Sequence, residues 1–433
     1  MAMNVEKQSS KFIKPFHPTP SINCRSKIGF TDELAPSIYT GVVSFFSPNH
    51  NHGLKFISKL EKSFEKTLTR LYPLAGRYDD EMRTVECNDE GAEFIHAKVN
   101  IKLQDFLGIE MNPLLVDEFI PLKSGAPLVY SNALLAIQVT MFECGGVAIG
   151  VSASHKIVDA STLCTFLNEW ASMNREENEI EFIGPGFNSS LLFPPRDLPS
   201  FPQPPPMTLS DDMLSKHTRV KLLFSECDIS KMKAKAIASG KVSTQQLSKV
   251  QLVSAMIWKA LNAIDKAIHN YPRESILLQA VNLRGKMASS ISKNSCGNLF
   301  GICTTKSGFY ETTDRLVDRL SDSIKNIKNN YSKVYHNSVE GQMMVLNSHL
   351  WLASINPRST NVVMLTSWCK FPFYETDFGF GKPIWVVPGT ITLRNSGCLI
   401  DDAQGKGVEA HVFLEVKDVP DFKQALGVDD FDS

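Results

Sequence analysis

The sequence predicts a mixed α/β protein with two domains, on three observations. The chain has 433 residues, and a single hydrophobic core usually stops growing at roughly 250 to 300 residues. Short β-like runs and helical periodicities are mixed along the whole length, as in domains built from sheets with flanking helices. A proline-rich stretch, Gly184 to Pro206, lies near the middle and suits an extended crossover. We therefore expect an N-terminal domain over 1–183, a linker over 184–219 and a C-terminal domain over 220–433.

The first half contains two predicted helices and a predicted hairpin. Apolar residues three and four positions apart indicate a helix that stops before Pro73, and a similar stripe indicates a second helix further on. Apolar runs over 135–140 and from 147 indicate two strands, joined by a turn at 143–146 with two glycines able to take positive φ. The two stripes are Ile57, Leu60, Phe64, Leu68, Leu71 and then Leu163, Phe166, Leu167, Trp170.

The second half follows the same mixed pattern. Asp228 can cap a short helix that ends near Gly240. Two longer helices are indicated by the stripes Val250, Val253, Ile257, Leu261, Ile264 and Leu316, Leu320, Ile324, Ile327. Short β-like runs follow at 384–387, 391–393 and 408–416.

The composition excludes several classes of partner. Lys plus Arg number 45 and Asp plus Glu 46, a balance that gives no general attraction for nucleic acid or an anionic membrane. The nine cysteines include no Cys-x-x-Cys pair and are expected to be reduced thiols. Residues Met1 to Lys14 lack a signal-peptide core, and no segment approaches 18 apolar residues. We expect a soluble cytoplasmic protein without a membrane anchor.

The most informative residues are His155 and Asp159, which follow the apolar run over 147–153 on a predicted turn. An imidazole there can take a proton from an alcohol near neutral pH and return it, although a short His-x-x-x-Asp pattern also fits a turn histidine satisfied by a backbone carbonyl. Asp159 has two open roles, orienting the imidazole or fixing the turn through a basic residue. Cys144 or Cys164 remains a possible nucleophile, although no motif supports either. A serine nucleophile is not supported, because no Gly-x-Ser-x-Gly elbow occurs. The histidines are scattered and predict no metal site.

A second distinctive run is Asp377-Phe378-Gly379-Phe380-Gly381. Its two glycines predict a backbone that turns tightly or is approached closely. It does not match a phosphate-binding glycine loop, since neither Gly-x-x-x-x-Gly-Lys-Ser/Thr nor Gly-x-Gly-x-x-Gly occurs there.

Together with further motifs, these two runs resemble the plant acyl-CoA-dependent acyltransferases of the BAHD family over nearly the whole chain. The region from Thr366 to Val386 looks most like members that acetylate alkaloids. Phe380 stands where the family pattern usually has Trp, which keeps an aromatic ring but loses the indole donor. The further motifs are Pro18-Thr19-Pro20, Leu71 to Arg77, Phe142 to Gly146, Val281 to Arg284, Gly297-Asn298 and Thr366-Ser367-Trp368.

The resemblance implies two chloramphenicol-acetyltransferase-like domains with a channel between them. It makes His155 the general base that deprotonates the acceptor hydroxyl for direct attack on the thioester. Asp159 would then pair with Arg284 and be structural. Asp377, Gly379 and Gly381 would hold the architecture away from the chemistry, with Asp377 in a salt bridge. Thr366 and Trp368 match channel positions near CoA and the developing oxyanion.

The expected function is O-acetylation of a plant alkaloid, with acetyl-CoA as co-substrate, no bound cofactor, no metal and a monomeric enzyme. Malonyl-CoA or another acyl donor, and a terpenoid or phenolic alcohol as acceptor, remain alternatives. A catalytically silent binding protein on the same fold is a further one. Positions beside the matched motifs suggest an acceptor pocket made of Ile38, Tyr39, Phe300 and Phe373.

Overall fold

The computed structural model describes most of the chain, and the longest gap falls in the predicted linker. The described residues are 3–49, 55–108, 113–123, 125–126, 128, 132–175, 186–196, 216–238, 247–271, 273–308, 311–356, 358–390 and 395–427. Most of the linker, the predicted strand over 391–393 and Gly240 therefore lie outside the described residues. The fold class is mixed α/β, as predicted.

The chain divides into two compact units that are not continuous in sequence. Unit 1 comprises Met1–Gln203, Ile291–Leu299 and Phe371–Thr390, and unit 2 comprises Pro204–Ser290, Phe300–Lys370 and Ile391–Ser433. The change at Gln203 falls inside the predicted linker. The two later segments of unit 1 come from the second half of the chain, so the boundary in the linker does not by itself separate the units.

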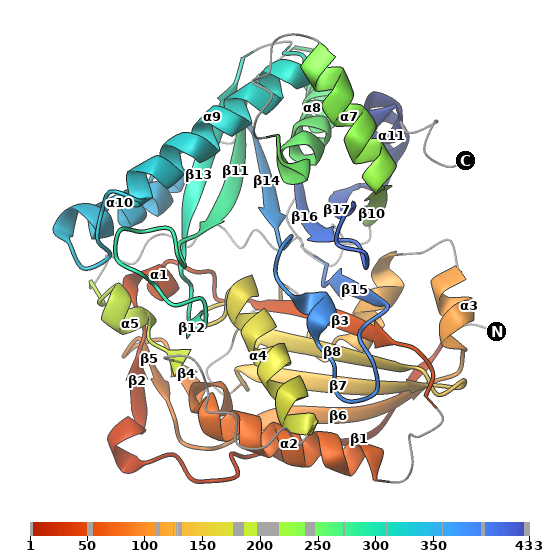
Figure 1. Cartoon of the computed structure of the whole chain (residues 1–433), viewed down its shortest axis with the longest axis vertical. Helices are drawn as coiled ribbons and strands as arrows, with labels where there is room; N and C mark the ends of the chain where they lie inside the picture. Colours follow the sequence, from red (N-terminus) through yellow and green to blue (C-terminus); the bar gives the residue numbers. More distant parts are fainter. Residues whose placement is uncertain are drawn as a thin grey trace. The chain divides into compact units, whose positions relative to one another are not determined.

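Unit 1 is built on a six-stranded sheet in the order β1-β6-β7-β8-β3-β15. Its helices α2 and α4 lie side by side over this sheet (Figure 1). The predicted helices and hairpin of the first half are confirmed, with α2 ending at Arg70 and β7 pairing antiparallel with β8. The strands are β1 Val5–Ile13, β2 Arg25–Lys27, β3 Tyr39–Phe46, β4 Arg77–Asp79, β5 Thr84–Glu86, β6 Ala92–Val99, β7 Leu135–Phe142, β8 Val147–Ser154, β9 Gly186–Phe187, β12 Ser295–Cys296 and β15 Trp385–Pro388. The helices are η1 Ser21–Asn23, α1 Phe30–Glu33, α2 Phe56–Arg70, η2 Tyr72–Ala75, α3 Leu103–Gly108, η3 Pro113–Phe119, α4 Ala160–Asn174, α5 Ser189–Leu192 and η5 Phe373–Glu375.

Unit 2 is built on a second six-stranded sheet in the order β10-β17-β16-β14-β11-β13. The two long predicted helices are present as α8 and α9. The strands are β10 His217–Phe224, β11 Glu274–Asn282, β13 Phe300–Ser307, β14 Thr360–Ser367, β16 Ser396–Asp401 and β17 Val408–Glu415. The helices are α7 Glu226–Ala238, α8 Lys249–His269, α9 Thr313–Tyr331, α10 Val339–Leu350, η4 Trp351–Ser354, η6 Val416–Asp418 and α11 Val419–Leu426.

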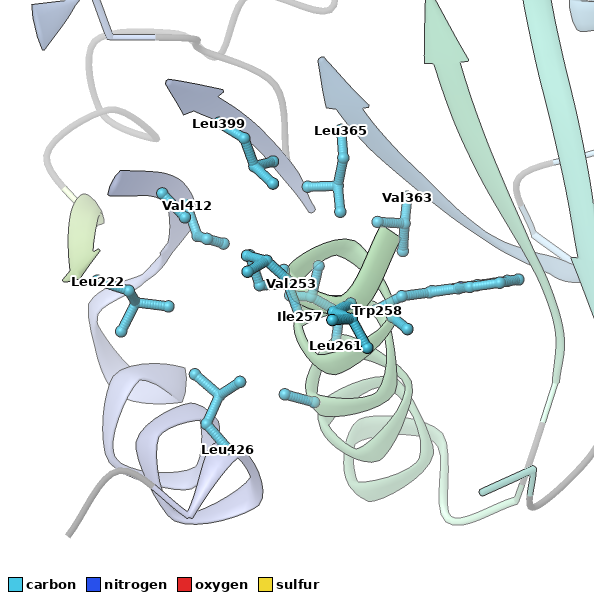
Figure 2. Packing of buried hydrophobic residues seen from close by; sticks show 14 of the residues in the cluster. Leu222, Val253, Ile257, Trp258, Leu261, Val363, Leu365, Leu399, Val412 and Leu426 are labelled. Carbon is cyan, nitrogen blue, oxygen red and sulfur yellow. The ribbon is translucent and has the colours of Figure 1, made fainter. Parts of the chain in front are cut away.

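The core of unit 2 lies between α8 and one face of its sheet. Val253, Ile257 and Leu261 of α8 face Val363, Leu365, Leu399 and Val412 of the strands, with Leu426 of α11 alongside (Figure 2). The i, i+4 spacing puts the three α8 residues on one helix face, and alternate strand residues meet them. Because Val363 and Leu365 point into this core, Thr366 of the same strand points to the other face of the sheet.

One prediction in unit 2 is corrected at the start of α7. Ser225, not Asp228, occupies the capping position, because Asp228 Oδ2 accepts a hydrogen bond from Ser225 N at 2.9 Å and Asp228 N donates to Ser225 Oγ at 3.2 Å. This reciprocal pair is a capping box with the carboxylate in the first turn.

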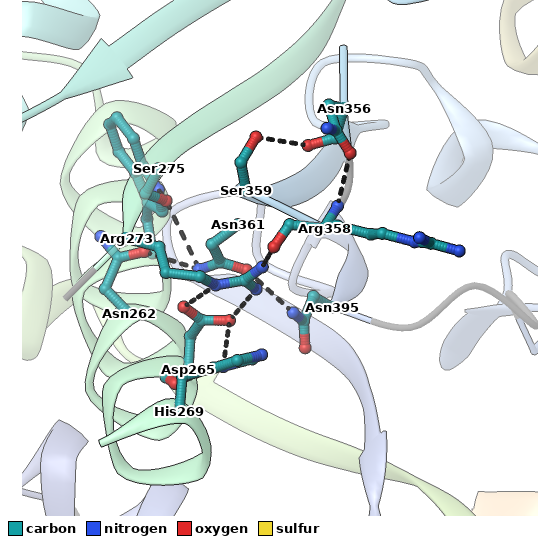
Figure 3. A network of polar contacts seen from close by, with 11 residues as sticks. Asn262, Asp265, His269, Arg273, Ser275, Asn356, Arg358, Ser359, Asn361 and Asn395 are labelled. Carbon is teal, nitrogen blue, oxygen red and sulfur yellow. Dashed lines mark hydrogen bonds and ion pairs between the residues drawn. The ribbon is translucent and has the colours of Figure 1, made fainter. Parts of the chain in front are cut away.

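A polar network ties the end of α8 to the strands that follow it (Figure 3). Asp265 accepts a hydrogen bond from Arg273 Nε at 3.0 Å, and both side chains are almost fully buried. Arg273 Nη1 also donates to the Arg358 carbonyl at 2.8 Å, and Asn361 Nδ2 donates to Asn262 Oδ1 at 2.9 Å. The network fixes α8 against the beginnings of β11 and β14.

Candidate active site

His155 lies on a tight turn that directly follows β8, as the sequence predicts. Its backbone N–H donates to the Ile38 carbonyl at 2.8 Å, and the N–H of Ser154 donates to the Leu134 carbonyl at 2.8 Å. Ile157 N and Val158 N both donate to the Ser154 carbonyl, at 3.2 and 3.1 Å. Neighbouring chain segments on both sides thus hold the backbone of His155.

The surroundings of the His155 side chain favour its neutral form. Burial lowers its pKa below the ordinary value of 6.5, and a hydrogen bond to its own backbone, the charge of Asp159 and the Asn298 side chain oppose that shift. The residue as a whole is partly exposed, although its Nδ1 is buried. A neutral imidazole at neutral pH is the form that accepts a proton.

Asp159 fixes the beginning of α4. Its Oδ1 accepts hydrogen bonds from the backbone N and the Oγ1 of Thr162, both at 2.8 Å, which makes Asp159 the N-cap of the helix. Its Oδ2 accepts from Leu299 N at 3.2 Å. The carboxylate therefore joins the His155 turn, α4 and the segment Ile291–Leu299.

Asp32 and Asn298 support the same turn, and the sequence interpretation did not assign them a site role. Asn298 Nδ2 donates to the His155 carbonyl at 2.8 Å and to Asp32 Oδ1 at 2.9 Å. Asp32 is 1% exposed and also accepts from Asn298 N at 2.7 Å, Gly29 N at 3.0 Å and the Ser189 hydroxyl. Burial raises the pKa of Asp32, and these donors oppose the shift. The sequence could have indicated Asn298, because it belongs to the Gly297-Asn298 motif, whereas no local sequence pattern indicates Asp32.

The Asp377 loop lies at the opposite end of α4 from His155. Asn174 Nδ2, near the last turn of α4, donates to the Phe378 carbonyl at 2.7 Å, and Arg175 donates to the Asp377 carbonyl. A helix of 15 residues is about 22 Å long at 1.5 Å per residue. The loop is thus far from the His155 turn.

The side chain of Asp377 binds its own loop. Its Oδ1 accepts from Gly379 N at 2.7 Å and Gly381 N at 3.1 Å, and within the described part of the chain it forms no ion pair. The predicted salt bridge is therefore replaced by backbone hydrogen bonds. Gly379 and Gly381 have φ of 92° and 108°, which confirms the predicted need for glycine. Phe380 packs edge-on against Phe46 and Phe56.

Four predicted site residues lie at one end of the sheet of unit 2. Arg284 follows the end of β11, and its N and Nη1 donate to Asn282 Oδ1 at 3.1 and 3.2 Å. Phe300, at the start of β13, is paired with Asn282. Because β14 runs parallel to β11 with Met364 opposite Leu278, Thr366 and Trp368 come level with the last residues of β11. The structure brings Arg284, Phe300, Thr366 and Trp368 to one sheet end.

The other predicted pocket residues lie in unit 1 in different surroundings. Ile38 contributes its carbonyl to the His155 turn. Tyr39 is 1% exposed, and its hydroxyl donates to the Ala133 carbonyl at 2.7 Å. Phe373 is fully enclosed in η5, next to Pro372, whose carbonyl accepts from Asn168 of α4 at 3.3 Å. Tyr39 and Phe373 thus present little surface to a ligand.

The structure also bears on the cysteines, on metal binding and on membrane-spanning helices. All nine cysteines are free, as predicted, and burial raises the pKa of the Cys164 thiol. Cys144 Sγ accepts a hydrogen bond from Leu103 N at 3.3 Å, which places it beside α3. Among the described residues, no group of three or more His, Cys, Asp or Glu side chains could hold a metal ion. No helix within the described ranges is long and apolar enough to cross a membrane.

Comparison with known proteins covers nearly the whole chain. The model of the Transferase family matches residues 3–427. A pelargonidin 3-O-(6-caffeoylglucoside) 5-O-(6-O-malonylglucoside) 4'''-malonyltransferase of Salvia splendens is 31% identical, over 98% of this chain and 99% of the relative. A limonoid 21-O-acetyltransferase of Melia azedarach is 29% identical, over 98% and 96%.

A third similar protein is vinorine synthase. The sequence from Rauvolfia serpentina is 31% identical over 95% of this chain and 94% of that protein. The crystal structure of vinorine synthase matches with a TM-score of 0.81 at 28% identity, over 96% of both chains. The similarity thus extends through both units.

Proposed function

The chain belongs to the BAHD acyltransferases, a family of acyl-CoA-dependent enzymes, and from this premise we propose that it acetylates a hydroxyl group of a plant alkaloid. The observation that carries the proposal is the His155 turn, which presents an imidazole with a lowered pKa. The backbone N–H of His155 donates to the Ile38 carbonyl, and its backbone carbonyl accepts from Asn298 Nδ2. This arrangement suits a general base that must be neutral before the reaction and cationic during it.

In the proposed reaction His155 takes the proton of the acceptor hydroxyl as its oxygen attacks the thioester carbonyl of acetyl-CoA. The tetrahedral intermediate then collapses, the C–S bond breaks, and the imidazolium returns its proton to the CoA sulfur. No acyl-enzyme forms, so no cysteine or serine nucleophile is needed. The raised pKa of Cys164 supports that choice, since a buried thiol is a poor nucleophile.

The remaining site residues take supporting roles in this proposal. Asp159 and Arg284 support the catalytic site structurally, and Asp159 keeps the turn and α4 in place. Thr366 and Trp368 help to place the thioester and its developing oxyanion. Asp377, Gly379 and Gly381 act on stability. Ile38, Tyr39, Phe300 and Phe373 stay as predicted positions of the acceptor pocket. Ile38 and Phe300 are better supported than the other two, because they are half-buried whereas Tyr39 and Phe373 are buried.

The donor and the acceptor each have one alternative with a specific basis. The Salvia relative is named as a malonyltransferase, which supports a malonyl donor. The Melia relative is named as a limonoid acetyltransferase, which supports a terpenoid acceptor. We favour acetyl and an alkaloid because the stretch from Thr366 to Val386 resembles alkaloid-acetylating members. We further propose a monomer that works in the cytoplasm, in keeping with its nine free thiols.

The proposal is tested by following thiol release from acetyl-CoA and malonyl-CoA with a panel of alkaloid and terpenoid alcohols. We expect acceptor-dependent release with acetyl-CoA that falls by at least about 10³-fold in His155→Ala, since general-base catalysis alone contributes roughly 10² to 10⁴. His96→Ala, a histidine on β6, is the matched control and should retain activity.

Two outcomes would contradict the proposal. Equal activity of His155→Ala and the wild-type protein would show that His155 is not the general base. Binding of the panel alcohols without any release of CoA from either donor would favour a catalytically silent binding protein.

A further inference from the structure

The Asp32 carboxyl group is surrounded by hydrogen-bond donors, all within unit 1. Its Oδ1 accepts from the backbone N of Asn298 at 2.7 Å and from Asn298 Nδ2 at 2.9 Å. Its Oδ2 accepts from Gly29 N at 3.0 Å and from the Ser189 hydroxyl. Backbone and amide N–H groups can only donate, so this arrangement suits a carboxylate, which can only accept. Asp32 is therefore held as an anion, although burial raises its pKa.

These contacts fix the orientation of the Asn298 side-chain amide. Its Nδ2 carries two hydrogens, and it donates to Asp32 Oδ1 and to the His155 carbonyl at 2.8 Å. Exchanging the amide nitrogen and oxygen would put an oxygen against two groups that only accept, so the hydrogen-bond network excludes that orientation. The anion at Asp32 thus determines where Asn298 Oδ1 points.

Asn298 Oδ1 faces the imidazole of His155. The oxygen is buried, and among the described residues no donor meets it at good hydrogen-bond geometry. The Asn298 side chain nevertheless raises the pKa of His155, which requires an acceptor beside the ring, because an acceptor favours the imidazolium. The ring also forms a hydrogen bond to its own backbone, which only Nδ1 can reach, and Nδ1 is buried. Both acceptors favour a hydrogen on Nδ1, and Nε2 then keeps the lone pair.

We propose that Asp32 is a positioning residue for the general base: it fixes the Asn298 amide, which holds the hydrogen on His155 Nδ1 and leaves Nε2 to take the proton of the substrate alcohol. This inference rests on the proposed function and adds a residue to its machinery. The charges that act most strongly on the ring are those of Asp159, which raises its pKa, and Lys156, which lowers it. The effect of Asp32 on the ring therefore passes mainly through Asn298.

Kinetics test the proposal in Asp32→Ala, with acetyl-CoA and the panel alcohol that the wild-type enzyme turns over best. The variant should lower kcat about 10- to 100-fold, which is part of the roughly 10² to 10⁴ that general-base catalysis contributes. The KM for acetyl-CoA should not change, and the acidic limb of kcat/KM against pH should move down, as expected for Asn298→Ala. Asp32→Asn keeps the shape and one acceptor oxygen. It should lose less activity, and it serves the same comparisons if Asp32→Ala does not fold.

The double variant Asp32→Ala/Asn298→Ala shows whether one residue acts through the other. If Asp32 acts through Asn298, the double variant should match Asn298→Ala in kcat and in its pH limb, because the effects of coupled residues do not add. A purely structural role of Asp32 would give the product of two separate losses, and the single Asp32 variant would keep the wild-type pH limb.

The matched control is Ser63→Ala on α2, which removes a buried hydroxyl that accepts from Trp170 Nε1 at 3.0 Å. This variant should lower the melting temperature, because it leaves a buried donor without its acceptor. It should leave the pH limb and kcat unchanged, which separates a loss of stability from a loss of positioning.

Nuclear magnetic resonance reads the tautomer of the ring without any turnover. In the full-length protein labelled with ¹⁵N-histidine, the ring signals of His155 are those missing from His155→Ala, and their two-bond couplings identify the nitrogen that carries the hydrogen. We expect the hydrogen on Nδ1 in the wild-type protein and in Ser63→Ala. In Asp32→Ala a detectable share of the rings should carry it on Nε2.

Three results would overturn the inference: a wild-type ring with its hydrogen on Nε2, a pH limb that does not move in the Asp32 variant, or losses that add in the double variant. Each can occur while His155→Ala abolishes transfer, so the proposed function would survive. Absence of transfer by the wild-type enzyme with every donor and alcohol would instead overturn the proposed function and this inference together.

Discussion

At the scale of single residues, the protonation of His155 sets the expected pH dependence. Burial lowers its pKa below 6.5, so the neutral base persists as the solution is acidified and is lost only when pH falls through the lowered value. We predict that the acidic limb of kcat/KM against pH has an apparent pKa below 6.5. A profile measured at saturating acetyl-CoA checks this, with Asn298→Ala as the comparison. Because the Asn298 side chain raises this pKa, its removal should move the limb further down. A limb at or above 6.5 would contradict the assignment.

The same scale shows what the sequence could provide. His155 and Asp159 were predictable because strand, turn and helix cap follow one another within a few residues, and local rules govern each. Asp32 and Asn298 meet across a separation of 266 residues, which no local pattern encodes.

At the scale of elements, α4 lies between the His155 turn, the proposed site of chemistry, and the Asp377 loop, the proposed structural element. A change in the loop should therefore affect stability. We predict that Gly381→Ala destabilises the protein by about 1 to 2 kcal/mol, because φ of 108° is strained for a residue with a Cβ even where no atom lies within 4 Å. The melting temperature should fall by roughly 1 to 2 °C, since the entropy of unfolding scales with chain length. Gly108→Ala, which meets no neighbour and has no positive φ, is the control and should not melt lower. Equal melting of the two variants would argue against a strained loop.

At the scale of the whole molecule, the free thiols give a direct measure of packing. Of the nine cysteines, Cys24 and Cys227 are exposed, Cys144 and Cys369 are intermediate and the others are buried. We predict that a thiol reagent modifies two cysteines rapidly in the native protein and all nine after denaturation without reductant. In Cys24→Ser/Cys227→Ser the rapid phase should disappear. Fewer than nine thiols after denaturation would reveal a disulfide and count against a reducing compartment.

The whole-molecule comparison also shows where prediction from sequence stops. The β-like run over 384–387 is present as β15, yet its partner is β3, where Val386 pairs with Ser44. A strand pattern reports alternation along the chain and carries no information on which edge it will join. The mixed α/β class could therefore be predicted, while the return of Phe371–Thr390 to unit 1 could not.

That return has a consequence for the order in which the protein is made. When the ribosome has synthesised the first 203 residues, β3 still lacks its neighbour β15, and its backbone N–H and C=O groups remain open to pairing with another chain. Asn298, which holds the carbonyl of His155, is also still missing. The nascent N-terminal segment is therefore both prone to association and catalytically unfinished until almost all of the polypeptide has left the exit tunnel.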